Sequence, residues 1–254
     1  MYYYVYDERA LAKDSQRALT KIETQINNLG LSGERGQVSA LRTVEDLVKD
    51  AARKNYRPIV AVGEDATFNA ALNALAELRS QIPLGYIPLV PKQPMSELLG
   101  VDANSAVVSL SRRIIKTVPV ALAGGAYFLS FVRCVLPDAP ATKWWERLLK
   151  KNERTFSAEF TLDDALKASV SAREVTVYFS PGSERLRVEA QGIAQHDKKN
   201  RQDLSVVWAK KIHLQGEPQL ACLIDGRPVT RTPIDISVSQ VHVKIIVGRA
   251  RSFE

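Results

Sequence analysis

The residues best placed for chemistry follow an apolar run at positions 59–62, Ile-Val-Ala-Val. Directly after it come Gly63-Glu64-Asp65-Ala66-Thr67, and then an Ala- and Leu-rich segment that favours a helix. A turn from a strand into a helix presents free backbone N–H groups beside the positive end of the helix dipole, and both favour an anion. The same pattern suits an ordinary turn in which Asp65 or Thr67 caps the helix. The local spacing leaves both interpretations open.

Histidine and cysteine give little sign of metal chemistry. His196, His213 and His242 are far apart in the sequence and have no Cys-x-x-Cys motif beside them, so we predict no metal site. Cys134 and Cys222 both lie inside apolar runs. We expect them to be buried thiols in a reducing compartment rather than a disulfide.

The composition is that of a folded globular protein. The 254 residues are 45% hydrophobic and 25% charged, which is enough for one large core or two modest ones. The start carries no basic region of a secretory signal, and the longest apolar run, 118–132, is too short to span a bilayer. We therefore expect a cytoplasmic protein, with peripheral attachment to a membrane as the alternative. The net charge of +7 would suit an anionic surface, but no aromatic-interleaved basic motif predicts a nucleic-acid partner.

The elements that must position the turn alternate between strand and helix in the first half of the chain. A β-rich opening at 2–6 precedes a helical pattern, and Thr43 with Asp46 forms a capping-box start for another helix. This alternation predicts a doubly wound α/β domain over residues 1–118. Strands are expected at 2–6, 37–41, 59–62 and 84–89, and helices at 15–29, 43–54, 65–79, 95–99 and 105–116.

The second half has a different pattern. Helices are expected at 144–151 and 162–168, after which apolar residues alternate with polar ones, as in 175–179 and 234–238. Turn signals such as Pro181-Gly182 separate these runs. The pattern predicts a mainly antiparallel, β-sandwich-like domain over residues 119–254.

The segment 59–75 resembles the diacylglycerol kinase catalytic family, which belongs to one superfamily with sphingosine and NAD kinases. The family signature is Gly-Gly-Asp-Gly-Thr followed by a helix reading Asn-Glu-Val-Val-Asn-Gly-Leu. Matching positions are Gly63, Asp65, Thr67, Asn69, Asn73 and Leu75. Weaker landmarks in register follow at 84–89, 96–101, 125–129, 224–226 and 232–234, so the similarity spans nearly the whole chain.

The resemblance implies a nucleotide site and a lipid kinase that uses ATP and Mg²⁺. The expected cleft between the domains would hold the turn, and the catalytic candidates are Asp65 and Asp225. The residues implied in nucleotide binding are Gly63, Glu64, Asp65, Ala66, Thr67 and Asn69.

Several departures from the family weaken the phosphate site. The loop after the first strand, Asn-Pro-x-Ser-Gly in the family, is replaced by Asp7-Glu8-Arg9-Ala10. Two glycines of the signature become Glu64 and Ala66, which add bulk, and the Glu64 carboxylate repels an anion. The prolines within 90–94 remove backbone donors from a second loop.

Two more departures fall in the second half of the chain. Pro119 stands where the family has an aspartate linked to its metal network, and Arg227 replaces the proposed general base. An arginine does not accept a proton at physiological pH. Together these changes predict that phosphoryl transfer is impaired and that the chain is a pseudoenzyme, because metal, phosphate cradle and base act as one unit.

The segment 143–154 is amphipathic if it is helical. Trp144 and Trp145 share its apolar face, and Arg147 and Lys150 lie among the basic residues opposite. This composition suits the interface of an anionic membrane, but the Trp pair would equally suit packing on the β domain or a homodimer contact.

Three hypotheses for function remain open from the sequence. The first is a diacylglycerol-kinase-like pseudokinase that binds a lipid, a nucleotide or a protein partner. The second is an active ATP-dependent lipid or small-molecule kinase in which Glu64 and Asp65 carry the metal. The third is a scaffold or dimeric interaction module with a vestigial cleft.

Overall fold

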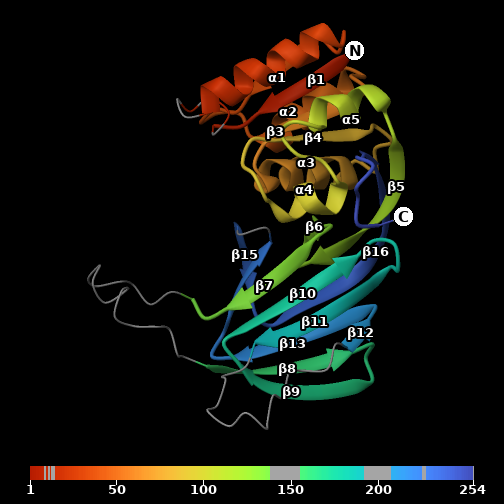
Figure 1. Cartoon of the computed structure of the whole chain (residues 1–254). Helices are drawn as coiled ribbons and strands as arrows, with labels where there is room; N and C mark the ends of the chain where they lie inside the picture. The colour runs from red at the N-terminus through yellow and green to blue at the C-terminus, as the bar shows by residue number, and fades with distance from the viewer. Residues whose placement is uncertain are drawn as a thin grey trace, which may run out of the picture. The chain divides into compact units, whose positions relative to one another are not determined.

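The computed structural model describes residues 1–8, 10, 12, 15–137, 155–191, 207–224 and 227–253. The chain forms two compact units (Figure 1). The first contains Met1–Val120, Tyr127–Ser130 and Ser239–Glu254, and the second contains Ala121–Ala126 and Phe131–Val238. The first unit therefore takes in two segments beyond the sequence-based boundary between residues 118 and 119.

A parallel sheet forms the centre of the first unit. Its strands run in the order β2-β1-β3-β4, and the last residues of β16 pair with β4 through Ile245 and Leu84. Every residue of β1, β3 and β4 is buried, as expected of parallel strands covered on both faces. The bounds are β1 Tyr2–Tyr6, β2 Gly33–Gln37, β3 Ile59–Gly63, β4 Leu84–Pro88 and β16 Ile234–Ile246.

Helices cover both faces of this sheet, so the unit is doubly wound, as predicted (Figure 1). On one face α1 and α5 pack against alternate residues of β1 and β3, and on the other α2 packs against α3. Ile22 and Ile26 of α1 join Tyr4 and Val60 in one buried cluster. The bounds are α1 Gln16–Asn28, α2 Val44–Arg53, α3 Asp65–Glu77, α4 Pro94–Leu99 and α5 Ala106–Arg112.

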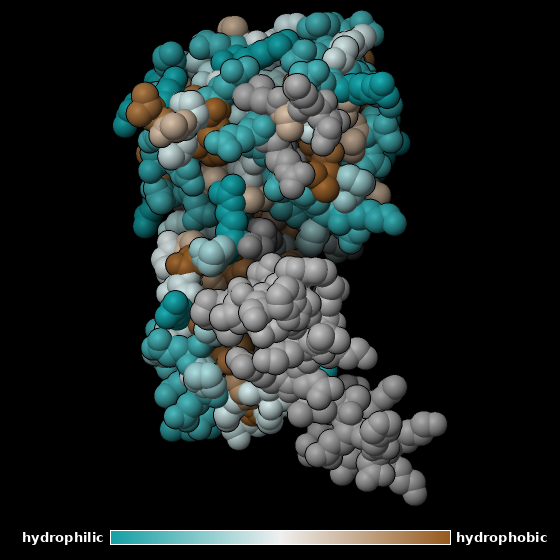
Figure 2. Space-filling model, turned by 90° about the vertical axis from the view of Figure 1, so that its left-hand side faces the viewer, coloured by the Kyte–Doolittle hydropathy of each residue, from teal (hydrophilic) through white to brown (hydrophobic). Residues whose placement is uncertain are grey.

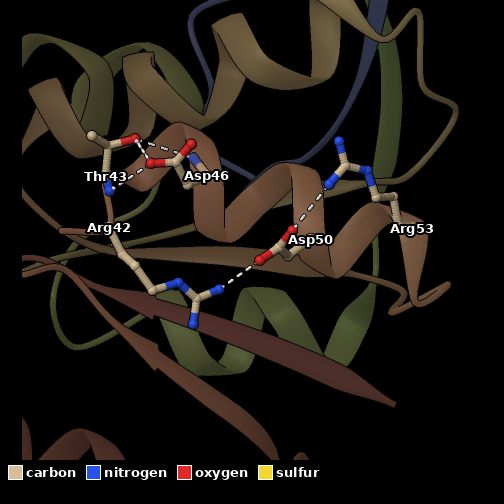
Figure 3. Close-up of polar contacts among 5 residues, drawn as sticks. All are labelled: Arg42, Thr43, Asp46, Asp50 and Arg53. Carbon is tan, nitrogen blue, oxygen red and sulfur yellow. Dashed lines mark hydrogen bonds and ion pairs between the residues drawn. The ribbon is translucent and has the colours of Figure 1, made fainter.

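The start of α2 confirms the predicted capping box. The Thr43 hydroxyl accepts the Asp46 backbone N–H at 3.2 Å, and the Asp46 carboxylate accepts the Thr43 backbone N–H at 3.0 Å. One turn later, the Asp50 carboxylate lies between Arg42 at 2.6 Å and Arg53 at 3.2 Å (Figure 3). These ion pairs are exposed, so each contributes little to stability.

The second unit is antiparallel, as its period-two pattern predicted. A six-stranded sheet has the order β12-β11-β10-β7-β14-β15, and β9, β8, β13 and the first half of β16 pair in turn. Val175, Val177 and Phe179 of β10 point into the core, in keeping with their alternation. The bounds are β5 Ile115–Ala123, β6 Ala126–Phe128, β7 Phe131–Val135, β8 Phe156–Leu162, β9 Leu166–Ala172, β10 Glu174–Ser180, β11 Arg185–Gln191, β12 Val207–Ala209, β13 Lys211–Glu217, β14 Ala221–Ile224 and β15 Arg227–Arg231.

The helix predicted at 162–168 is wrong, because this stretch is the turn of the β8–β9 hairpin. Asp163 and Asp164 both adopt positive φ, at 49° and 58°, which reverses the chain between the strands. The alternating burial of β8 begins at Phe156, ahead of the stretch that was interpreted as helical. The helix predicted at 144–151 lies outside the described residues.

Two other predicted bounds also need correction. The strand expected at 37–41 is β2, at Gly33–Gln37, where glycines replace the usual apolar pattern; a Cβ on Gly33 would lie 2.3 Å from the Tyr2 carbonyl oxygen. The helix expected to reach residue 116 ends at Arg112, because Arg113 turns left-handed with φ of 50° and β5 begins at Ile115.

The surface drawn in Figure 2 is mainly hydrophilic over the first unit, where apolar side chains occur singly. Among the described large apolar residues, Leu41 is the most exposed, at 93%. Scattered apolar residues of this kind are normal on a folded protein and define no patch. Among the described helices, none has the length and apolar character needed to cross a membrane.

Candidate phosphate-binding turn

The carboxyl ends of β1, β3 and β4 meet at one edge of the parallel sheet. Tyr6 of β1 lies opposite Val62, and Gly63 of β3 lies opposite Pro88 of β4. The residues that follow these strands are therefore neighbours in space although they are far apart in sequence. In open α/β sheets, this edge is where ligands bind.

The Asp7 side chain reaches across this edge to the start of α3. Its Oδ2 atom accepts the Glu64 backbone N–H at 3.0 Å and the Thr67 hydroxyl, while its Oδ1 atom accepts the Ala10 N–H at 2.8 Å. The donors and the positive end of the helix dipole favour an anion there. The protein supplies that anion itself, as a carboxylate.

Gly63 allows this carboxylate to come close. A Cβ atom on Gly63 would lie 1.9 Å from Asp7 Oδ2 and 2.4 Å from its Cγ, so any other residue would collide with the side chain. The family signature places glycine at this position, where it lets a phosphate approach. In this chain, Asp7 takes up the space that the glycine leaves.

The Asp65 side chain is buried and both of its oxygens are hydrogen-bonded within the protein. Its side chain is buried, with Oδ1 accepting the Tyr86 hydroxyl and Oδ2 accepting the Met95 backbone N–H, each at 2.8 Å. Burial raises the pKa of the carboxyl group above its ordinary value, and the two hydrogen bonds only partly offset this. Both oxygens are engaged in linking the start of α3 to β4 and α4.

Gln93 completes the frame around the turn. Its Oε1 atom accepts the Asp65 backbone N–H and lies 3.0 Å from the Tyr86 hydroxyl oxygen, which has one proton to share between Gln93 and Asp65. Gln93 is also the N-cap of α4, where Pro94 fixes the first turn. Thus two distant side chains, Asp7 and Gln93, satisfy backbone N–H groups at the start of α3.

The sequence interpretation missed both partners. It placed Asp7 in the substituted loop and Gln93 among the substituted residues, but assigned neither a contact with the turn. The available signal was their place directly after β1 and β4, because parallel strands bring such positions to one edge. The N-cap of α3 is Glu64, whereas one of the two interpretations of the sequence placed it at Asp65 or Thr67; the Thr67 hydroxyl instead donates to Asp7.

Farther along α3, Asn73 holds the backbone of β6. Its Nδ2 donates to the Tyr127 carbonyl oxygen at 2.8 Å and its Oδ1 accepts the Tyr127 N–H at 2.7 Å. Asn69 lies one turn earlier, and its buried Oδ1 atom has no hydrogen-bond partner in the described structure. Asn73 therefore acts as a structural clamp, while the Asn69 amide oxygen keeps its hydrogen-bonding capacity.

The remaining predicted residues are distributed as follows. Ala66 is buried in the first turn of α3, and Arg227 is exposed at the start of β15 in the second unit. Asp225, Trp144, Trp145, Arg147 and Lys150 lie outside the described residues. Among the residues that are described, no group of three or more His, Cys, Asp or Glu side chains is arranged to hold a metal ion.

The doubly wound unit and the antiparallel unit together give the fold seen in solved structures of a diacylglycerol kinase and an NAD kinase. The family model of the diacylglycerol kinase catalytic domain matches residues 2–122. Over that span, the chain matches the diacylglycerol kinase catalytic domain, as the resemblance predicted.

Solved structures extend the likeness of fold to nearly the whole chain. A diacylglycerol kinase from Bacillus anthracis str. Sterne is 20% identical with a TM-score of 0.77, and the similarity covers 98% of this chain and 97% of that one. Another structure from the same strain has 21% identity and a TM-score of 0.79, covering 98% of both chains. An NAD kinase from Archaeoglobus fulgidus in complex with ATP is 14% identical with a TM-score of 0.62, covering 98% and 94%. No curated protein sequence matches this chain.

Proposed function

We propose that this protein is a diacylglycerol-kinase-like pseudokinase, which binds a lipid or a protein partner without efficient phosphoryl transfer. The observation that carries the proposal is the Asp7 carboxylate on the Glu64 N–H and the Thr67 hydroxyl. These donors belong to the turn that would receive a nucleotide phosphate in the family. As the residues stand, the turn does not fit a triphosphate.

Electrostatic repulsion opposes the binding of a phosphate group beside the Asp7 carboxylate. Two unit charges 4 Å apart repel by about 1 kcal/mol in water and about 4 kcal/mol at the effective dielectric near a protein surface. A phosphate group would meet the Asp7 carboxylate at shorter range, because that carboxylate packs directly on Gly63. For a phosphate to bind, Asp7 must leave and give up three hydrogen bonds.

Other parts of the expected machinery are also used or replaced. Both oxygens of Asp65 are engaged by Tyr86 and Met95, which opposes a role in holding Mg²⁺. Arg227 stands at the position of the family's proposed base and does not accept a proton. These features support a binding role over the active-kinase alternative.

The test compares the wild-type protein with Asp7→Ala and with a matched control, Asp46→Ala. Asp46 also caps a helix start in the first unit, but it lies at α2. We expect Mg-ATP at millimolar concentration to leave the wild-type and Asp46→Ala melting temperatures unchanged. For Asp7→Ala we expect a rise of a few degrees, because the anion position becomes free.

The same proteins are then incubated with Mg-ATP and diacylglycerol-containing vesicles. We expect no ADP release from the wild-type protein, and co-sedimentation with the vesicles in the absence of ATP would identify a lipid as its ligand. If the wild-type protein releases ADP and forms a phosphorylated lipid at the rate of an ordinary kinase, the pseudokinase proposal is wrong.

A further inference from the structure

The two cysteines of the chain face one another across two neighbouring strands. Cys134 on β7 lies directly opposite Cys222 on β14 in an antiparallel register, between the pairs Val135–Ala221 and Arg133–Leu223. Both side chains are fully buried, and their sulfur atoms are 3.0 Å apart. The thiols are free, as the sequence predicted.

This arrangement is close to the geometry that a cross-link needs. Directly opposed residues on antiparallel strands have Cβ atoms roughly 4.5–5.5 Å apart, and a disulfide needs roughly 3.5–4.5 Å. The two sulfur atoms are already in contact, so a bond requires only a small approach of two side chains. No change in strand pairing is needed.

The two thiols are also chemically unequal. The Cys134 S–H group donates its hydrogen bond to the Cys222 sulfur. This hydrogen bond lowers the pKa of Cys222, and it acts with burial to raise the pKa of Cys134. Because the thiolate is the reactive form, Cys222 is the first sulfur to be oxidised.

Access to Cys222 is available from one side of the sheet. Among the described strands, β14 pairs on its outer edge with β15, the last strand of that sheet, and their pairing shifts register between Cys222 and Leu223. Edge strands open locally more easily than central ones, because fewer contacts hold them. We therefore expect a small oxidant to reach Cys222 by local opening of β15, without global unfolding.

We propose that Cys134 and Cys222 are an oxidation site that forms a reversible intramolecular disulfide when a peroxide is the oxidant. The Cys222 thiolate attacks one oxygen of hydrogen peroxide; the O–O bond breaks, and the product is a sulfenic acid with hydroxide. The Cys134 sulfur then attacks the Cys222 sulfur, the S–O bond breaks and water leaves. In sum, two thiols and one hydrogen peroxide give one disulfide and two water molecules.

The cross-link has a defined structural effect. It closes a loop between residues 88 positions apart in sequence, and it fixes β14, the strand that leads to residues 225–226 and then to Arg227. The oxidised protein should therefore be more resistant to heat, by about 5 °C for a domain of this size. This inference is independent of the proposed function.

The experiment exposes the folded protein to hydrogen peroxide, then unfolds it in denaturant with N-ethylmaleimide to block the remaining thiols, and maps peptides without reduction. We expect a linked peptide containing Cys134 and Cys222, a mass loss of about 2 Da, a raised melting temperature and full reversal by dithiothreitol. Cys134→Ala should give no linked peptide and no melting shift, because Cys222 then has no second thiol to form a disulfide with.

Three outcomes would contradict the proposal. One is labelling of both thiols after peroxide treatment of folded wild-type protein, and another is a linkage between two chains only. The third is stable overoxidation of a single cysteine in the wild-type protein. Because the peptide map uses the unmodified sequence, the test holds even if Cys134→Ala folds poorly.

Discussion

The free backbone N–H groups at the starts of α2 and α3 are hydrogen-bonded by different kinds of partner. At α2, Thr43 and Asp46 satisfy the free N–H groups from within one turn of the helix (Figure 3). At α3, the donors of Glu64 and Asp65 are satisfied by Asp7 and Gln93, which lie 57 and 28 positions away in the sequence. Local capping needs only the helix itself, whereas distant capping needs a correctly folded sheet edge.

This difference indicates that the start of α3 has the features of an anion-binding site. A helix start that serves only stability is commonly capped by its own residues, as α2 is. A start without a local side-chain cap, with a glycine that leaves room above it, has the form of an anion site. In this chain, the Asp7 carboxylate occupies that anion position.

The largest effect is expected from Gly63→Ala. The new methyl group would collide with the Asp7 carboxylate, and the backbone at φ of +155° is unfavourable for alanine. We expect a loss of about 3 kcal/mol in the free energy of unfolding, measured by urea denaturation. In the double variant with Asp7→Ala the collision disappears, so a penalty equal to the sum of the single ones would contradict this account.

Asp7→Ala is expected to cost about 2 kcal/mol, because three hydrogen bonds to a charged group are lost. Inorganic phosphate should restore part of this stability by binding to the freed donors. The recovery is measured as the difference in the free energy of unfolding between phosphate and a chloride salt at equal ionic strength. Equal recovery in Asp46→Ala would show that the salt effect is general.

Thr43→Ala is expected to cost about 1 kcal/mol, the usual value for the loss of a helix N-cap. Phosphate should give no recovery, because the start of α2 has no glycine that would let a phosphate approach the backbone. A phosphate response as large as that of Asp7→Ala would remove the distinction between the two helix starts.

The smallest effect is expected from Asp65→Asn, whose amide can keep both contacts, with Met95 and Tyr86. The raised pKa of Asp65 means that the folded state holds its proton more tightly than the unfolded state. Its contribution to stability is therefore greatest below the ordinary Asp pKa of about 4 and declines as pH rises through the folded value. Stability measured from pH 4 to 8 should fall less steeply in Asp65→Asn than in the wild-type protein.

The sequence predicted those features that depend on neighbours in the chain. The continuous apolar run at 59–62 identified β3, and Thr43 with Asp46 identified the start of α2. β2 was misplaced because Gly33 and Gly36 carry no apolar signal; its position follows from close passage beside β1. The hairpin at Asp163-Asp164 was missed because its polar turn lies between two short alternating strands.

For the candidate site too, the sequence gives the position of the turn but not the distant residues that contact it. Family spacing located Gly63, Asp65 and Thr67 at one turn, and the structure places them there. The occupant of that turn could not be read from local pattern, because a carboxylate at Asp7 reaches it only once β1 and β3 are paired. The sequence predicted that Glu64 would repel a phosphate; in the structure, the Asp7 carboxylate also occupies the position where the phosphate would lie.

The chain passes between its two compact units at residues 120, 126, 130 and 238. A fragment that ended at Leu122, where the family match stops, would lack Tyr127, the partner of Asn73, and the strand that pairs with Leu84. Such a fragment would expose an unpaired edge of β4 and the adjoining face of α3, both of which invite self-association. We therefore expect the matched segment to need residues 127–130 and 239–253 to complete its folding unit.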